Sequence, residues 1–318
     1  MATVRTVDSP TGLAAPAARA GRSTGIAIGL ASAMFFGTSG TFGSALIGAG
    51  WSPGGAVLAR VFVAALALTI PALIALRGRW SLLRRSALRV LTYGLVGVAA
   101  CQVCYFNAIS LMPVGVALLL EYMGVVLIVG WLWLRHGQRP RTLTVAGGVA
   151  ALGGLALMLN LSGPGGASQA GVIWALLAAV AMAVYFLQSA ADDADALPPV
   201  VLTWGGMVTG AAALAVTGAA GLVPLRASTS DVALFGHRVS VLVPVLGLSL
   251  VAAAAAYVLG IGAARRLGPK LSSFVAMAEI VFAVVFAWVL LHQVPAATQF
   301  VGGALIALGV IAVRVDES

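Results

Sequence analysis

Runs of roughly 20 apolar residues recur along the whole chain, and this pattern limits the fold more than any other feature. A helix of that length crosses a hydrocarbon core of about 30 Å. Of the 318 residues, 61% are hydrophobic and 8% are charged, whereas soluble domains carry roughly 25% charged residues. Helices also satisfy every backbone polar group within lipid. The sequence therefore predicts an all-α integral membrane protein.

The apolar runs divide into ten segments separated by turn-forming or polar residues such as 51-WSPGG-55 and 162-SGPGG-166. We expect each segment to form one transmembrane helix. In chain order they are Thr24–Ala49, Gly55–Leu76, Val90–Leu111, Val114–Leu134, Leu143–Leu161, Gly171–Ala190, Val200–Leu222, Val239–Ala263, Leu271–Leu291 and Ala297–Val313. Residues 1–23 are small and polar and lack the apolar core of a signal peptide, so we expect a disordered cytoplasmic tail there.

The basic residues predict the orientation in the membrane. Five arginines lie in 77-RGRWSLLRRSALR-89, three in 135-RHGQRPR-141, and two arginines and a lysine in 265-RRLGPK-270, whereas the first, third and fifth connections carry no charge. By the positive-inside rule these basic loops and both termini are cytoplasmic, in a multi-pass protein of the cell membrane. The acidic 192-DDAD-195 falls on the same side, but acidic residues weigh little in this rule. The net charge of +9 follows from these loops, so no nucleic-acid partner is expected.

An internal repeat organises the chain. The offset that aligns Pro140 with Pro295 also aligns the Gly-Gly pairs of 140-PRTLTVAGGVAALGGLALM-158 and 295-PAATQFVGGALIALGVIAV-313. Each copy holds five segments, an odd number, so the second copy must be inverted in the membrane. The basic content of equivalent loops is opposite, as inversion requires. We therefore expect a first repeat at residues 24–161 and an inverted second repeat at 170–315, the architecture of secondary transporters.

The repeats also resemble the drug/metabolite transporter superfamily in its EamA-type ten-helix form. The resemblance rests on 105-YFNAISLMPVGVALLLEYMGVVLIVGWLWL-134, on 263-AARRLGPKLSSFVAMAEIVFAVVFAWVLL-291 and on the Gly-Gly helices that follow them. The chain departs from the family at 134-LRHGQ-138 and 290-LLHQV-294, where a glutamate of an LGE-like turn is absent. The sequence 118-LLLEYMG-124 resembles the corresponding sequence in the branch of the family that exports amino acids such as threonine and homoserine. The resemblance implies a secondary transporter, most often an exporter.

Two of the three glutamates of the chain lie inside apolar segments. Glu121 and Glu279 fall within one helical turn of each other at the repeat offset, and both lie near the bilayer midplane. An ionised group there costs roughly 2.5–3.5 kcal/mol on insertion scales, a cost tolerated when the group faces a water-filled cavity or is protonated. We expect them to bind a substrate ammonium or to carry a proton. The alternative is a neutral carboxyl that hydrogen-bonds between helices.

Other polar residues in the segments are candidates for the same pathway. They are Gln102, Tyr105 and Asn107 in the third segment, Tyr185 and Gln188 in the sixth, and Tyr257 in the eighth. Arg60 could hold a substrate carboxylate or phosphate, but snorkelling to the outer surface or structural pairing is the favoured interpretation. Tyr122 points about 100° away from Glu121 on a continuous helix, so it is expected in packing. The stretch 37-GTSGTFG-43 suggests a locally weakened helix, and the Gly-Gly pairs suggest close helix packing.

These features favour a transporter that exports small metabolites such as amino acids by alternating access, with proton coupling through the glutamates. A multidrug or lipid-intermediate carrier on the same fold stays open and differs only in ligand. A membrane enzyme acting on a lipid-linked substrate is disfavoured, because His136, His237 and His292 are scattered and no aspartate lies in a segment. No cofactor or metal is expected, and Cys101 and Cys104 are expected in packing. The expected partners are a small-molecule substrate and the bilayer, with a homodimer left open.

Overall fold

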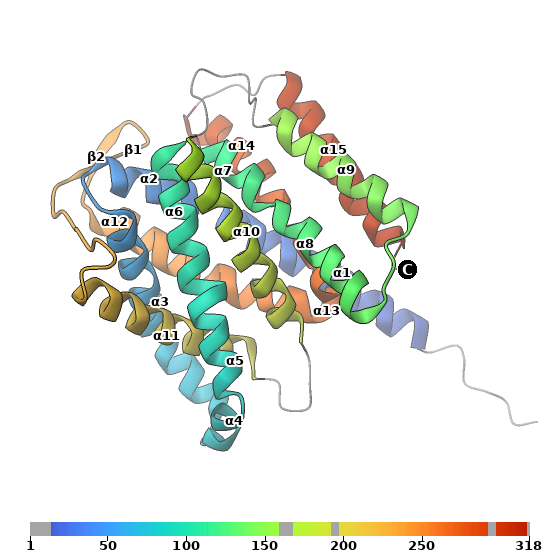
Figure 1. Cartoon of the computed structure of the whole chain (residues 1–318), viewed down its shortest axis with the longest axis horizontal. Helices are drawn as coiled ribbons and strands as arrows, with labels where there is room; N and C mark the ends of the chain where they lie inside the picture. The colour runs from blue at the N-terminus through green and yellow to red at the C-terminus, as the bar shows by residue number, and fades with distance from the viewer. Residues whose placement is uncertain (1–13, 113, 159–167, 192–196, 292–296, 317–318) are drawn as a thin grey trace, which may run out of the picture.

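The computed structural model describes residues 14–112, 114–158, 168–191, 197–291 and 297–316. Helices account for nearly all regular structure in these ranges, as the apolar runs predict (Figure 1). The first half contains α1 (Ala14–Phe36), α2 (Ser39–Gly48), α3 (Pro53–Leu76), α4 (Trp80–Arg85), α5 (Ala87–Thr92), the π-helix η1 (Tyr93–Ala100), α6 (Cys101–Leu111), α7 (Val114–Glu121), α8 (Met123–His136) and α9 (Thr142–Met158).

The second half follows the same plan. It contains α10 (Gln169–Ala190), α11 (Pro199–Ala219), α12 (Leu242–Leu246), the π-helix η2 (Gly247–Ala255), α13 (Ala256–Ala276), α14 (Ala278–Leu291) and α15 (Ala297–Asp316). In both halves a π-helix lies within the third predicted segment, so the repeat extends to local helix geometry. Gly268, with φ 76°, kinks α13 just before Pro269 and separates the eighth predicted segment from the ninth.

Among the residues that the structure describes, seven helical stretches are long and apolar enough to cross a membrane. They are Arg22–Gly48, Pro53–Leu76, Ala87–Leu111, Val116–His136, Gln169–Ala190, Pro199–Ala219 and Leu242–Ala276. The last of these includes the Gly268 kink and the start of the ninth segment. The other predicted segments correspond to α9, which has 17 residues, and to α14 and α15. A multi-pass membrane protein follows, while the count of ten crossings stays a prediction.

The beginning of the first helix differs from the expectation. The structure places Ala14–Ser23 in α1, inside the stretch that we expected to be a disordered tail. Alanine favours helix in 14-AAPAARA-20, and proline is tolerated in a first helical turn. Residues 1–13 of the expected tail and the acidic loop 192–195 lie outside the described residues.

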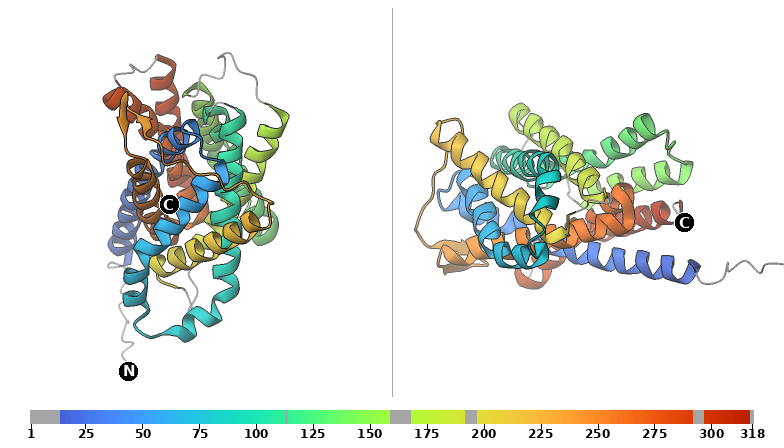
Figure 2. Two further views of the ribbon diagram at one scale, coloured as in Figure 1. Left: turned by 90° about the vertical axis from the view of Figure 1, so that its left-hand side faces the viewer. Right: turned by 90° about the horizontal axis from the view of Figure 1, so that it is seen from below.

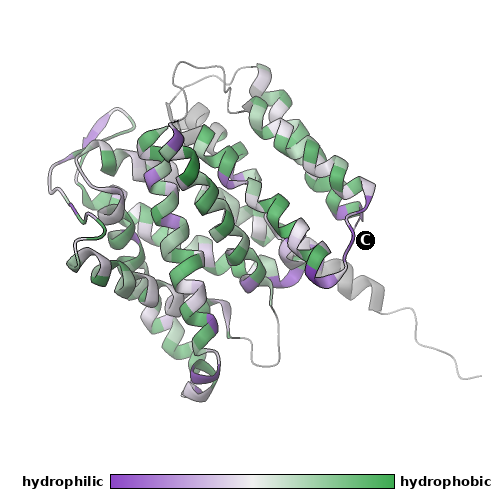
Figure 3. Ribbon diagram, in the orientation of Figure 1, coloured by the Kyte–Doolittle hydropathy of each residue, from purple (hydrophilic) through white to green (hydrophobic). Residues whose placement is uncertain are grey.

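Most helices are coloured as hydrophobic along much of their length, and hydrophilic residues gather at several helix ends and loops (Figure 3). Along α3, for example, Phe62, Leu66 and Ile70 are exposed. Such a row would be unfavourable in water but matches lipid chains. The hydrophobic effect therefore drives these helices into the bilayer, while their association depends on close packing.

The Gly-Gly helices α9 and α15 lie side by side, so the fifth segments of the two repeats pair with each other (Figure 1). A Cβ atom on Gly154 would lie 2.5 Å from the Gly302 carbonyl oxygen, and one on Gly309 would lie 2.5 Å from that of Gly147. Only glycine permits this approach of the two backbones. The predicted packing role of these glycines is confirmed.

An extended connection joins α11 to α12 at one end of the molecule (Figure 2). It contains the hairpin of β1 (Val232–Leu234) and β2 (His237–Val239), which turns at Phe235 and Gly236, both with positive φ. The Ser52 hydroxyl, which caps α3, donates to the Pro224 carbonyl at 2.6 Å and accepts from the Arg226 amide at 2.8 Å. The connection therefore covers the beginning of α3.

Candidate functional site

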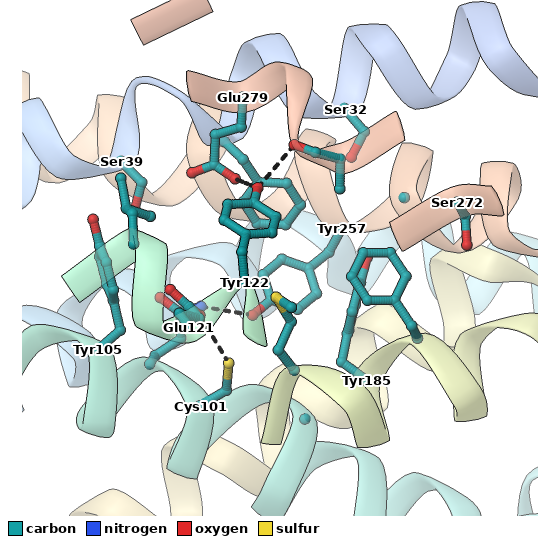
Figure 4. Close-up of a pocket in the computed structure, with 18 of the residues that line it drawn as sticks. Ser32, Ser39, Cys101, Tyr105, Glu121, Tyr122, Tyr185, Tyr257, Ser272 and Glu279 are labelled. Carbon is teal, nitrogen blue, oxygen red and sulfur yellow. Dashed lines mark hydrogen bonds between the residues drawn. The ribbon is translucent and has the colours of Figure 1, made fainter. Parts of the chain in front are cut away.

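A cavity lies between the two halves of the chain, at the place where several helices are interrupted (Figure 4). About 80 Å³ of it is open to the centres of water-sized molecules, and a single water needs roughly 10–15 Å³ by that measure. The cavity can therefore hold several waters or the polar part of a small metabolite. Its polar lining residues are Ser32, Ser39, Arg60, Cys101, Gln102, Tyr105, Glu121, Tyr122, Tyr185, Tyr257, Ser272 and Glu279.

The fourth segment of each repeat is interrupted beside its glutamate. The repeat offset aligns Tyr122, between α7 and α8, with Met277, between α13 and α14. At the first break the Val125 amide donates to the Tyr122 carbonyl at 3.0 Å, and at the second the Ile280 amide donates to the Met277 carbonyl at 3.2 Å. Both are bonds over three residues instead of four. Helix interruptions at a repeat interface are typical of transporter binding sites.

The first helix is interrupted at the same level. It stops at Phe36 and resumes at Ser39, as the Gly, Ser and Thr content of 37-GTSGTFG-43 predicts. A Cβ atom on Gly37 would lie 2.9 Å from the Glu279 carbonyl oxygen, so this break packs directly against the beginning of α14. Three helix breaks therefore converge on the cavity.

Tyr122 connects the two repeats through these breaks. Its hydroxyl lies 2.8 Å from the Ala276 carbonyl oxygen and 2.9 Å from Glu279 Oε2 (Figure 4). The Ala276 carbonyl is available because the Ile280 amide, its partner in a regular helix, donates to Met277 instead. Tyr122 is buried, as the expectation of packing implies, but that expectation missed its two contacts with the second repeat.

The two glutamates line the cavity and are both half-buried. Cys101 Sγ lies 3.6 Å from Glu121 Oε1, a weak thiol–carboxyl contact. Cys101 thus lies beside a candidate site residue as well as being buried. Glu279 takes its contact from the opposite repeat, through Tyr122. The cavity therefore brings together the two acids that the sequence places in apolar segments.

Arg60 is 1% exposed and turns inward, so the snorkelling part of the favoured interpretation was wrong, while its other part, structural pairing, agrees with the contacts of the side chain. Its Nη1 donates to Ser39 Oγ at 2.7 Å and to Gln102 Oε1 at 2.6 Å, and its Nη2 donates to the Ala252 carbonyl oxygen. The acceptors come from α2, α6 and η2. The connection between α11 and α12 covers the beginning of α3, the helix that carries Arg60.

Gln102 extends the same network, since its Nε2 donates to the Tyr257 hydroxyl at 3.0 Å. Tyr105, Tyr185 and Tyr257 all line the cavity, as expected from the sequence. Tyr185 packs edge-on against Tyr257, with 5.3 Å between ring centroids. Aromatic rings therefore form one wall beside the polar groups.

Two residues predicted to line the substrate pathway, Asn107 and Gln188, lie outside the cavity. Asn107 is not among the cavity residues, and its Nδ2 donates to the Val103 carbonyl at 2.8 Å within its own helix. Gln188 is also outside the cavity, where its Nε2 donates to Thr92 Oγ1 at 3.1 Å and links α10 to α5. Both amides are satisfied by helix contacts, which was the structural alternative for polar residues in apolar segments.

Three serines were missed by the sequence reasoning. Ser32, Ser39 and Ser272 line the cavity, and the Ser32 hydroxyl donates to the Ala256 carbonyl at 2.8 Å. Serine is common in membrane helices, so only Ser39, within 37-GTSGTFG-43, carried a local signal.

Comparison with known proteins agrees with this arrangement. The model of the EamA-like transporter family matches residues 23–160 and again residues 169–315. The chain belongs to the EamA-like transporter family. The double match also supports the two-repeat organisation of this EamA-like chain, and the family consists of transporters, which argues against the membrane-enzyme alternative.

The fold of this EamA-like chain also resembles solved structures. One of them, a crystal structure described only as that of a protein, superimposes with a TM-score of 0.69 at 23% sequence identity, over 92% of this chain and 98% of the other. At this identity the likeness concerns the fold alone. No curated protein matches the chain.

Proposed function

We propose that this EamA-like protein is a secondary transporter of the cytoplasmic membrane that exports small metabolites such as amino acids, with proton coupling. The observation that carries the proposal is the cavity between the repeats, lined by two glutamates at matching helix breaks. Secondary transporters with inverted repeats bind substrate at this kind of interface and move one repeat against the other.

The lining favours a polar metabolite over a lipophilic drug. Hydroxyl, amide, guanidinium and carboxyl groups surround the cavity, and the space suits a small molecule. Many of these groups already bond to one another, but a lipophilic drug would offer nothing to those that do not, such as Arg60 Nε, at a cost of roughly 1–3 kcal/mol for each buried polar group. A substrate ammonium, in contrast, would interact with Glu121 or Glu279.

Proton coupling is supported by the hydrogen bonds of Tyr122, because its single hydroxyl hydrogen cannot be donated to two acceptors at once. Its hydroxyl carries one hydrogen but lies within hydrogen-bond distance of both the Ala276 carbonyl and Glu279. Both contacts are bonds when Tyr122 donates to Ala276 and a protonated Glu279 donates to Tyr122. Loss of that proton breaks one of the two links between the repeats. The proton on Glu279 would therefore stabilise this conformation of the cycle.

The proposal is tested by thermal unfolding of the purified protein in detergent with the 20 L-amino acids and a set of lipophilic cations. We expect one or a few amino acids to raise the melting temperature of wild type but not of Glu121→Gln or Glu279→Gln. The same amino acid should then be driven across proteoliposome membranes by a pH gradient. Gln188→Leu is the control, because this side chain lies outside the cavity.

Stabilisation by lipophilic cations alone would instead support a multidrug carrier. Equal binding of the amino acid by wild type and both glutamine variants would remove the glutamates from the substrate site.

A further inference from the structure

We infer that Arg60 forms an oxyanion-binding subsite of the cavity, which takes the carboxylate of a zwitterionic substrate whose ammonium faces Glu121 and Glu279. The inference rests on the proposed function and deepens it, because it distinguishes amino acids from amines of the same size. The argument depends on the charge of Arg60, on its free donor and on the helix end beside it.

The buried guanidinium is not paired with an acid. Its three hydrogen-bond acceptors are a hydroxyl, an amide oxygen and a backbone carbonyl, all neutral. Among the residues that the structure describes, no carboxylate makes an ion pair with it, although two glutamates line the same cavity. Buried charges in proteins are normally paired. Glu279 acts on this charge only from a distance, so a direct anionic partner is left to the ligand.

One hydrogen-bond donor of Arg60 is not used within the part of the protein that the structure describes. Its Nε is buried and has no acceptor within the described ranges. Nη1 and Nη2 donate to the acceptors seen in the structure, and these hydrogen bonds hold the guanidinium plane in place. A guanidinium fixed in this way is prepared to bind an oxyanion with little further loss of conformational freedom.

The beginning of α2 adds a second positive feature at the same place. Ser39 is the first residue of α2, lines the cavity and accepts from Arg60 Nη1 at 2.7 Å. Its own hydroxyl hydrogen has no acceptor in the described part of the chain, and the first amides of a helix lack intrahelical partners. A helix N-terminus attracts anions, and in transporters such ends can face substrate carboxylates.

The acids give the cavity an opposite pole, through Glu121 while Glu279 holds its proton and through both carboxylates once Glu279 has lost it. Glu121 from α7 and Glu279 from α14 line it together with Arg60 from α3. An α-amino acid offers a carboxylate and an ammonium separated by a single carbon, so one small molecule can serve both poles. An amine satisfies only the acidic pole, and it leaves the Arg60 charge uncompensated.

The test compares ligands on wild-type protein first. Calorimetric titration uses the amino acid that stabilises the protein best, its decarboxylated amine and its carboxamide. We expect the amine and the carboxamide to bind roughly 10- to 100-fold more weakly than the acid, the range for loss of a charge-assisted hydrogen-bonded contact. This comparison needs no variant, so it holds even if substitution of Arg60 prevents folding.

The variant arm uses Arg60→Gln and Arg60→Lys. We expect Arg60→Gln to lower the affinity for the amino acid to that for the amine, with the amine affinity itself unchanged, and Arg60→Lys to recover part of the loss. Arg89→Gln is the matched control. Arg89 is half-buried, whereas Arg60 is fully buried, and its guanidinium also has backbone acceptors, at Gln188 and Ala191, but it lies outside the cavity.

Two results would overturn the inference. One is equal affinity of wild type for the amino acid, its amine and its carboxamide. The other is an equal loss of amino-acid and amine binding in Arg60→Gln, which would make Arg60 a purely structural residue. In both cases the proposed transport of an amino-group substrate stands. If only lipophilic cations bind and no amino acid does, the proposed function and this subsite fail together.

Discussion

Tyr122 joins the helix breaks of the two repeats, since its hydroxyl reaches both Ala276 and Glu279. Each repeat contributes its glutamate at the break, but only the first repeat contributes a tyrosine, because the equivalent position is Met277. The link between the repeats is therefore asymmetric, although the backbone is repeated. An asymmetric link lets protonation of Glu279 act differently from protonation of Glu121.

We expect Tyr122→Phe to weaken this link. The Ala276 carbonyl would lose its donor, which costs about 1–3 kcal/mol of stability, and Glu279 would lose its partner from the first repeat. In proteoliposomes, the stimulation of amino-acid transport by a pH gradient should fall several-fold relative to transport without a gradient. Tyr105→Phe is the control, because the Tyr105 hydroxyl lines the same cavity and makes no hydrogen bond within the described ranges. If a pH gradient stimulates transport equally in wild type and Tyr122→Phe, the hydrogen bond between Tyr122 and Glu279 plays no part in proton coupling.

At the scale of elements, the pair α9 and α15 shows how a membrane protein associates without a hydrophobic driving force between its helices. Glycines let the backbones approach until carbonyl oxygens touch the facing helix. A neighbouring glycine on the same helix, Gly153, is exposed, and no heavy atom lies within 4 Å of the place that a Cβ atom would take there. Gly153 therefore does not share this role.

This contrast predicts different effects for two adjacent substitutions. Gly154→Ala places a methyl group about 2.5 Å from the Gly302 carbonyl and should destabilise the protein by roughly 1–3 kcal/mol, as overpacking does. Gly153→Ala should be neutral or slightly stabilising, because alanine has the higher helix propensity. Melting temperatures of both variants in detergent check the prediction. Similar melting temperatures would mean that α9 and α15 are not held by close backbone contact.

At the scale of the whole molecule, the predicted inversion of the second repeat would decide which loops share a side of the membrane. The charge pattern predicts that 135-RHGQRPR-141 is cytoplasmic and that the connection carrying the β1–β2 hairpin is outside. Both regions are exposed, at Arg139 and at Ser230 for example, and are therefore accessible to a reagent.

Cysteine labelling tests this topology. A membrane-impermeant maleimide should label Ser230→Cys in intact cells and Arg139→Cys only after the membrane is opened. The native Cys101 and Cys104 are buried at 5% and 7% exposure, so wild type should give little background. Labelling of both positions from the same side would contradict the inverted arrangement and the alternating-access mechanism built on it.

Local properties of the sequence were enough to predict an all-helical membrane protein, the two repeats, the glycine contacts and the break in the first helix, while the count of ten crossings stays a prediction. These features depend on hydropathy, helix propensity and spacing along the chain. Each of these can be assessed without knowing which other segment packs against it. The coincidence of Glu121 and Glu279 at the repeat offset was also sufficient to bring them to one site.

Only the tertiary structure decided which face of each helix lines the cavity. Asn107 and Gln188 are polar like Gln102, but their rotation within the bundle gives them partners elsewhere. Arg60 lies near a helix end, yet a connection from the second half of the chain covers that end and leaves inward acceptors as its partners. Helix rotation, helix breaks and long-range covering depend on the packing of all helices together, and no segment of sequence contains that information alone.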